Sequence, residues 1–141
     1  MGMSLARRGP DCSQQLKRTT TEGHQAVQLH FFSSVLHLRG ETMAPQPAVD
    51  EFENVLVWNG QVYDGLDIPK QESDTTHVLK TVARESPQTP ESVQLALSTL
   101  VGPYAFIYYI AATQQLVFGR GPLGRRSLLV RKVTTLKLVA D

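Results

Sequence analysis

The chain has 141 residues, 41% hydrophobic and 19% charged, which is the size and apolar content of one globular domain. Its 14 Lys and Arg against 13 Asp and Glu give a formal net charge of +1, so no overall field attracts nucleic acid or an anionic membrane. No apolar run approaches the roughly 20 residues of a membrane span, and the first residues are too weakly apolar for a signal peptide. We expect one domain over residues 1–141, cytoplasmic and without disulfides, since Cys12 is the single cysteine.

The first segment, residues 1–16, contains a strong interruption. Gly9-Pro10 punctuates the backbone because glycine frees φ whereas proline fixes φ and removes a donor. We therefore expect a short helix or turn on each side of this pair. A polar stretch over residues 17–23 follows.

Residues 27–38 are rich in β-branched, aromatic and leucine side chains at close to strand spacing. This pattern predicts one strand ending near Phe32 and a second strand over residues 35–39. Residues 40–50 contain two prolines among small and acidic side chains, which indicates a loop.

Asn59-Gly60 is the sharpest local signal, because it stands between two apolar runs. Both residues tolerate positive φ, which favours a two-residue turn and a hairpin-like reversal at this point.

Two helices are predicted in the middle of the chain. Ser73 or Asp74 can cap a segment whose apolar residues fall on one face. Thr89-Pro90-Glu91 supplies a cap, a first-turn proline and an early acid for a second helix that reaches Leu100 and is closed by Gly102.

The last third predicts successive strands over residues 104–110, 115–119, 127–133 and 136–140, with a turn at residues 112–114. Strands, then helices, then strands indicate an α+β fold with antiparallel pairing.

Most familiar catalytic patterns are absent from the sequence. There is no nucleophile elbow, P-loop or dinucleotide fingerprint, and we expect no cofactor. The histidines are scattered with no zinc-ligand spacing, so we expect no metal site; they are His24, His30, His37 and His77. Cys12 lies in a polar context typical of an ordinary surface or half-buried cysteine.

A basic cluster near the C-terminus raises a nucleic-acid hypothesis, since phosphate binding needs clustered cations. The cluster consists of Arg120, Arg125, Arg126, Arg131 and Lys132. It is diluted by leucines and has few aromatic neighbours, so solvated strand edges and turns are the favoured interpretation, with no nucleic-acid partner.

Asn59-Gly60 also has a chemical interpretation beside the structural one. A side-chain amide next to an unhindered backbone N–H is what an oxyanion hole requires, two donors that converge on one oxygen. Spacing alone leaves both interpretations open.

Four short segments of the sequence, taken together, match the motifs of a known family. In chain order they are Arg8-Gly9-Pro10-Asp11, Val57-Trp58-Asn59-Gly60-Gln61-Val62-Tyr63, Ser73-Asp74-Thr75, and Gly102-Pro103-Tyr104-Ala105-Phe106 leading to Phe118-Gly119-Arg120-Gly121-Pro122-Leu123-Gly124-Arg125. Together they resemble the class II glutamine amidotransferase domain of asparagine synthetases, with its RGPD, NGE-I-Y, SDT or SDC, and A-R-D-P-L-G segments. Each is weak alone, but the ordered set spans nearly the whole chain.

The resemblance implies an N-terminal-nucleophile hydrolase fold, an αββα sandwich of two antiparallel sheets between helical layers. In such enzymes an N-terminal cysteine attacks the glutamine side-chain amide, forms a thioester and releases ammonia. The resemblance places Asn59 and Gly60 as oxyanion donors, Gln61 and Asp74 on the substrate side, and Arg8, Gly9, Pro10 and Asp11 in a structural loop near the site. An ATP-binding domain of asparagine-synthetase type would use the ammonia for asparagine biosynthesis.

The chain departs from the family at several positions. It begins Met1-Gly2-Met3-Ser4, so the N-terminal cysteine and the first strand have no counterpart, and Cys12 cannot replace a terminal cysteine with a free amine. Gln61 stands where the family has Glu, which should weaken glutamine binding. The family's arginine near the second strand would fall close to Leu36, with Arg39 as a stand-in, and Gly121 replaces an Asp.

The leading hypothesis is therefore an amidotransferase-like domain, truncated at both ends and lacking glutaminase activity, whose affinity for glutamine is weak or lost. The alternative is a non-catalytic protein-interaction module that has kept the fold. A third hypothesis is that the true start of the protein lies upstream of Met1.

Overall fold

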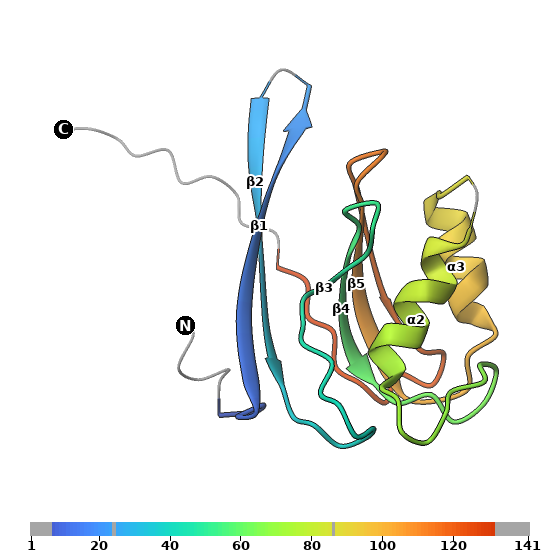
Figure 1. The fold of residues 1–141 in the computed structure, drawn as a ribbon. Helices are drawn as coiled ribbons and strands as arrows, with labels where there is room; N and C mark the ends of the chain where they lie inside the picture. The colour runs from blue at the N-terminus through green and yellow to red at the C-terminus, as the bar shows by residue number, and fades with distance from the viewer. Residues whose placement is uncertain (1–6, 24, 86, 132–141) are drawn as a thin grey trace.

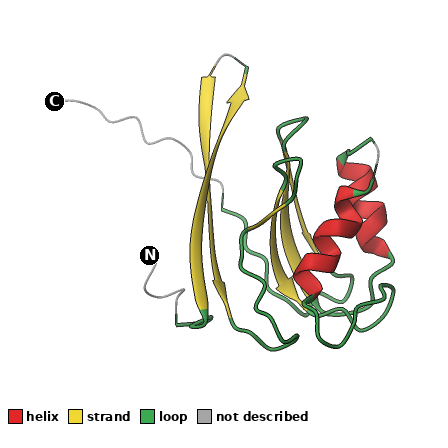
Figure 2. Cartoon of the chain, viewed as in Figure 1, coloured by secondary structure: helices red, strands yellow, loops and turns green. Residues whose placement is uncertain are grey.

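The computed structural model describes residues 7–131 apart from 24 and 86. The chain forms three layers (Figure 1): a two-stranded ribbon, a four-stranded antiparallel sheet, and two helices on the face of that sheet away from the ribbon. Figure 2 shows the same layers by secondary structure. The elements are β1 (Cys12–Glu22), β2 (Gln25–Val35), β3 (Ala48–Val49), β4 (Val55–Gly60), α2 (Asp74–Ala83), α3 (Pro90–Ser98), β5 (Tyr104–Ile110) and β6 (Gln115–Arg120). The sheet order is β3-β4-β5-β6. The predicted α+β class with antiparallel sheets is confirmed.

The N-terminal ribbon is longer and more regular than its sequence indicated. β1 and β2 pair without a break from Cys12 opposite Val35 to Glu22 opposite Gln25. The prediction of a helix or turn after Gly9-Pro10 is wrong, and so is the division of residues 27–39 into two strands. Threonines in the polar stretch have high strand propensity, but only their cross-strand partners show that the stretch is a strand.

Asn59 and Gly60 do not form a hairpin turn, so that prediction is also wrong. They are the last two residues of β4 and pair with Ala105 and Tyr104 of β5. The chain continues in the same direction, since the Gln61 N–H donates to the Pro103 carbonyl at 3.0 Å. In a hairpin, the residues just after the turn pair with the strand just before it. Here the strand that pairs with β4 is β5, which begins more than forty residues later. Glycine is required at position 60 because a Cβ there would lie 2.5 Å from Cβ of Tyr104.

Both predicted helices are confirmed, with their caps. The Ser73 side chain accepts a hydrogen bond from the Thr75 N–H at the start of α2, and Thr89 forms a capping box with Ser92 at the start of α3. α3 ends at Ser98, two residues before the predicted end. Gly102 does not close the helix.

The C-terminal strands are confirmed in part. β5 and β6 match the predicted ranges 104–110 and 115–119 closely, and Gln114 at φ 57° completes the turn between them. Residues 127–131 form no strand, contrary to the prediction for 127–133. The strand predicted over 136–140 lies outside the described residues.

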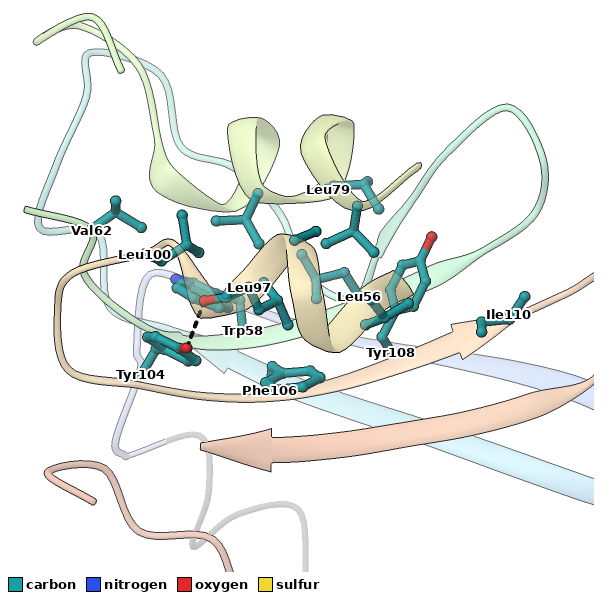
Figure 3. Packing of buried hydrophobic residues seen from close by; sticks show 14 residues of the cluster. Leu56, Trp58, Val62, Leu79, Leu97, Leu100, Tyr104, Phe106, Tyr108 and Ile110 are labelled. Atoms are coloured by element: carbon teal, nitrogen blue, oxygen red, sulfur yellow. Dashed lines mark hydrogen bonds between the residues drawn. The ribbon is translucent and has the colours of Figure 1, made fainter. Parts of the chain in front are cut away.

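The main hydrophobic core lies between the sheet and the helices (Figure 3). Side chains at alternate positions of β4 and β5, such as Leu56 and Tyr108, meet apolar residues of α2 and α3. Trp58 stacks on Tyr104 with ring centroids 5.0 Å apart, and the Tyr104 hydroxyl donates to the Leu97 carbonyl at 2.9 Å, the dashed line in Figure 3. Burial also raises the pKa of Tyr104.

A smaller cluster joins the ribbon to the other face of the sheet. Phe31 of β2 packs with Val55 and Tyr109, and partly buried apolar residues surround the three. Gln114 adds a polar clamp, because its Oε1 accepts from the Thr20 hydroxyl at 2.7 Å and from the N–H and hydroxyl of Thr21 at 2.8 and 3.0 Å. No helix in the described ranges has the length and apolar character to cross a membrane.

Candidate functional site

A cleft of about 580 Å³ opens where the end of the ribbon meets the end of β4. Its walls come from the last residues of β2, the segment after β2, the end of β4, the start of α2, and residues 125–127. This volume lies within the range of about 300–1,000 Å³ that is usual for small-molecule sites.

The cleft exists because the sheet leaves one edge of β4 uncovered. β3 has two residues and pairs only with Leu56 and Val55. Residues 57–60 of β4 therefore have a strand neighbour on the β5 side alone. The uncovered edge exposes backbone groups that a longer β3 would have paired.

The backbone donors of this edge can be followed residue by residue. In an antiparallel strand successive N–H groups point to opposite neighbours. Gln61 donates toward β5, whereas the Trp58 N–H donates to Gln46 Oε1 and the Val62 N–H to Asp74 Oδ2, both at 2.7 Å on the uncovered side. Gly60 is two residues from Trp58 and two from Val62, so its N–H points to the uncovered side as theirs do.

Asn59 and Gly60 both line the cleft. The Asn59 side chain is exposed and forms no hydrogen bond with any residue that the structure describes. Its amide is therefore available next to the Gly60 N–H. Their role as oxyanion donors stays a prediction.

Asp74 also lines the cleft, but its carboxylate is already engaged. It is the first residue of α2 and is 5% exposed. Oδ1 accepts from Arg39 at 2.8 Å, and Oδ2 accepts from the Val62 N–H. Arg39 in turn donates to the carbonyls of Val62 and Ile68 at 2.9 and 3.3 Å. This network fastens the loop after β4 to the start of α2.

Gln61 lines the same cleft, and its Oε1 accepts from the Tyr63 hydroxyl at 3.2 Å. Four of the residues predicted from the sequence therefore line the same cleft: Asn59, Gly60, Gln61 and Asp74.

The predicted loop of Arg8, Gly9, Pro10 and Asp11 fastens the end of β2, and only Arg8 reaches the cleft. Gly9 is buried, and a Cβ there would lie 2.5 Å from the Ser34 carbonyl carbon. The Asp11 N–H donates to the Val35 carbonyl at 3.1 Å, while its Oδ2 accepts from the N–H of His37 at 2.7 Å.

Cys12 does not contribute to the cleft. It lies at the start of β1 opposite Val35, half-buried, and is not among the lining residues. Since the chain has one cysteine, the described cleft contains no thiol. Among the described residues no three His, Cys, Asp or Glu side chains are grouped so that they could bind a metal ion.

Sequence reasoning missed several lining residues. Ser33 of β2 and Trp58 of β4 line the cleft, but no sequence pattern assigned a chemical role to either of them. Arg125 and Arg126 belonged to the basic cluster assigned to strand edges and turns, but they line the cleft, whereas Arg120 is exposed at the end of β6. Lys132 lies outside the described residues.

Comparison with known proteins identifies a family to which the chain is similar. Residues 34–140 match the family described as glutamine amidotransferase domain. The chain is 42% identical over 125 residues to asparagine synthetase domain-containing protein 1 of Gallus gallus, an alignment that covers 89% of this chain and 19% of that protein. The same-named proteins of Bos taurus and Homo sapiens are 42% and 37% identical over 129 and 126 residues, covering 89% of this chain and 19% and 18% of those proteins. The chain thus spans about a fifth of these relatives' length. No solved structure matches it.

Proposed function

The chain belongs to the glutamine amidotransferase domain family, and from that premise we propose that its cleft binds the side-chain amide of glutamine through Asn59 and Gly60 without hydrolysing it. The uncovered edge of β4 is the observation that carries this proposal. It turns the Gly60 N–H to the uncovered side, next to the Asn59 amide, which has no hydrogen-bond partner among the described residues. Two converging donors are suited to the oxygen of a primary amide.

Binding without hydrolysis follows from the contents of the cleft. Hydrolysis by the family's chemistry needs a nucleophilic sulfur at the amide carbon. The chain's one cysteine, Cys12, lies outside the cleft. The 141-residue chain is therefore proposed to act as a binding domain.

A larger role is proposed for longer proteins of this type. The relatives carry asparagine synthetase domain in their names. In such a protein, a domain with a complete site would release ammonia to an ATP-binding domain of asparagine-synthetase type, which would use it in asparagine biosynthesis.

Calorimetric titration of the 141-residue chain with glutamine tests the proposal. We expect measurable binding that Asn59→Ala weakens roughly tenfold, since a lost hydrogen bond of about 1.4 kcal/mol corresponds to that factor. Gln94→Ala, on the exposed face of α3, is the control and should bind as the parent does. Absence of glutamine binding would favour the alternative, an interaction module that has kept the fold.

An assay of glutamate and ammonia release completes the test. The proposal predicts no release above that of the Cys12→Ser variant. Steady release that disappears in Asn59→Ala would contradict the non-hydrolytic part of the proposal and leave the binding part intact.

A further inference from the structure

The outer edge of β6 has free backbone groups. β6 is the last strand in the order β3-β4-β5-β6 and pairs with β5. The Gly121 N–H donates to the Tyr104 carbonyl at 2.8 Å, which fixes the backbone groups of β6 that face β5. Because this direction alternates along an antiparallel strand, the N–H and carbonyl groups of Leu116, Phe118 and Arg120 point away from β5. They have no backbone partner among the described residues.

The side chains along the same edge are apolar and partly exposed. Val117 packs against the main core on the helix side, so by alternation Leu116 and Phe118 lie on the opposite, ribbon side. They are 43% and 48% exposed. Their cross-strand neighbours on β5 are Tyr109 and Ile107, which lie in or against the cluster that the ribbon covers. The ribbon therefore covers part of β4 and β5 and leaves the apolar side chains of β6 partly open.

β6 also lacks the features that usually protect an edge strand. In soluble proteins such strands carry a proline, a lysine or an inward-pointing charge, which prevents pairing with another strand. β6 has none of these between Gln115 and Gly119, and its single charged residue, Arg120, stands at its end. β3, at the opposite edge of the sheet, has two residues and offers little for a partner to pair with. β6 is therefore the edge of this sheet that a further strand fits.

A second copy of β6 fits this edge in the antiparallel direction. When Val117 lies opposite Val117 of the second copy, Leu116 faces Phe118 of that copy, and Phe118 faces its Leu116. These are residues whose backbone groups are free, so each pair can exchange both of its hydrogen bonds. The same pairs bring apolar side chains side by side across the two strands, which stabilises the pairing.

The charges permit this pairing, and the sheet order limits it to two copies. Arg120 of each copy lies opposite the uncharged Gln114 of the other, so the two arginines do not face each other, which would be destabilising. The contact uses the β6 edge of both copies, and the joined sheet then ends at a two-residue β3 on each side. A contact of this kind has a two-fold axis and is closed.

We infer that β6 is an interface between two copies of this chain, which join their four-stranded sheets edge to edge into one continuous sheet. The interface buries Leu116 and Phe118 and satisfies their free backbone groups. It is small and contributes few hydrogen bonds, so the association is weak, with a Kd between about 10 μM and 1 mM. The inference is independent of the proposed function, because no residue of β6 lines the cleft.

Sedimentation equilibrium over a range of concentrations measures the association, with a reductant present so that Cys12 cannot link two chains. We expect a monomer–dimer equilibrium in the parent. Phe118→Lys places a charge near the centre of the contact and should weaken the association at least roughly tenfold. Leu95→Lys makes the same change of chemistry on α3, where the side chain is 68% exposed, and should associate as the parent does. Circular dichroism and a thermal melt establish that both variants are folded.

Hydrogen exchange followed by NMR tests the parent without any substitution. The N–H groups of Leu116 and Phe118 should exchange fast in dilute protein and slowly at concentrations above the Kd, whereas the Val117 N–H faces β5 and should exchange slowly in both. A chain that stays monomeric up to about 1 mM overturns the inference, as does association that Phe118→Lys leaves unchanged. Slow exchange of Leu116 and Phe118 at every concentration also overturns it, because another part of the same chain would then cover the edge.

Discussion

The two faces of the four-stranded sheet differ in how completely they are covered. On the helix side, a large continuous cluster of buried side chains from the sheet, α2 and α3 leaves few polar atoms (Figure 3). On the ribbon side, the buried residues Phe31, Val55 and Tyr109 and the hydrogen bonds of Gln114 connect the layers, and the cleft opens beside them. The helix side therefore holds most of the buried apolar contacts, and the incompletely covered side leaves room for the cleft.

Deleting side-chain volume on the helix side should have the largest effect. Leu56 is fully buried in β4, so Leu56→Ala removes apolar contacts and leaves a cavity, at a cost of about 2–5 kcal/mol in the free energy of unfolding. Urea unfolding measures this change. Leu95→Ala on α3, where the side chain is 68% exposed, is the control and should change stability by less than about 0.5 kcal/mol. Equal effects of the two variants would remove the distinction between the faces.

Asp74 lies at the border of the two regions, and its loss should come next in size. Asp74→Ala leaves the Val62 N–H and the partly exposed Arg39 guanidinium without their partner. An unsatisfied buried donor costs about 1–3 kcal/mol, and we expect about 2 kcal/mol by urea unfolding. Asp67→Ala, at an exposed site in the loop before α2, serves as the control. Unchanged stability in Asp74→Ala would mean that the carboxylate is free for ligand rather than structural.

Alkaline pH should act on the helix side through buried tyrosines. Burial, with a smaller contribution from the negative charge of Asp50, raises the pKa of Tyr108, while a hydrogen bond from Gln88 lowers it slightly. A folded-state pKa above the unfolded value of 10.0 gives stability that is fully present below pH 10 and lost as pH rises toward the folded pKa. The slope is about 1.4 kcal/mol per pH unit for one group.

The measurement is urea unfolding between pH 9 and 11 for the parent and for Tyr108→Phe. The variant should show a shallower loss of stability above pH 10, because it has one fewer buried hydroxyl to ionise. Identical slopes in the two proteins would show that Tyr108 does not contribute.

The ribbon clamp should give the smallest effect. Gln114→Ala removes three hydrogen bonds from an exposed side chain, for which we expect a cost of about 1 kcal/mol. The loss should be local, so hydrogen exchange should become faster in β1 and β2 and stay unchanged in β5. Thr113→Ala in the same turn is the control. Faster exchange in both layers would indicate that they unfold as one unit.

The sequence predicted best where the signal was local. The caps at Ser73 and Thr89 and the continuous apolar run of β5 contain their own structural information, and those elements match closely. β1 could not be found in this way, since its threonines and charged residues become a strand only through pairing with β2. The same limit explains the error at Asn59-Gly60, whose partner strand is far away in the chain.

The site was predictable in part for the same reason. The order of the sequence motifs predicted Asn59, Gly60, Gln61 and Asp74 as one group, and all four line the same cleft. The motifs gave no indication that the Asp74 carboxylate forms a salt bridge with Arg39, because that pair depends on the path of the loop after β2. The arginines at 125 and 126 reach the cleft through a segment without regular structure, which strand and helix patterns do not describe.

The most direct test of the uncovered edge of β4 as the ligand site is an NMR titration that follows backbone amides and the Asn59 side-chain amide as glutamine is added. The account predicts that the Gly60 N–H and the Asn59 side-chain amide shift most, with saturation at the same concentration for both, while amides of α3 do not move. Saturable shifts confined to residues away from the cleft, with Gly60 unchanged, would contradict it.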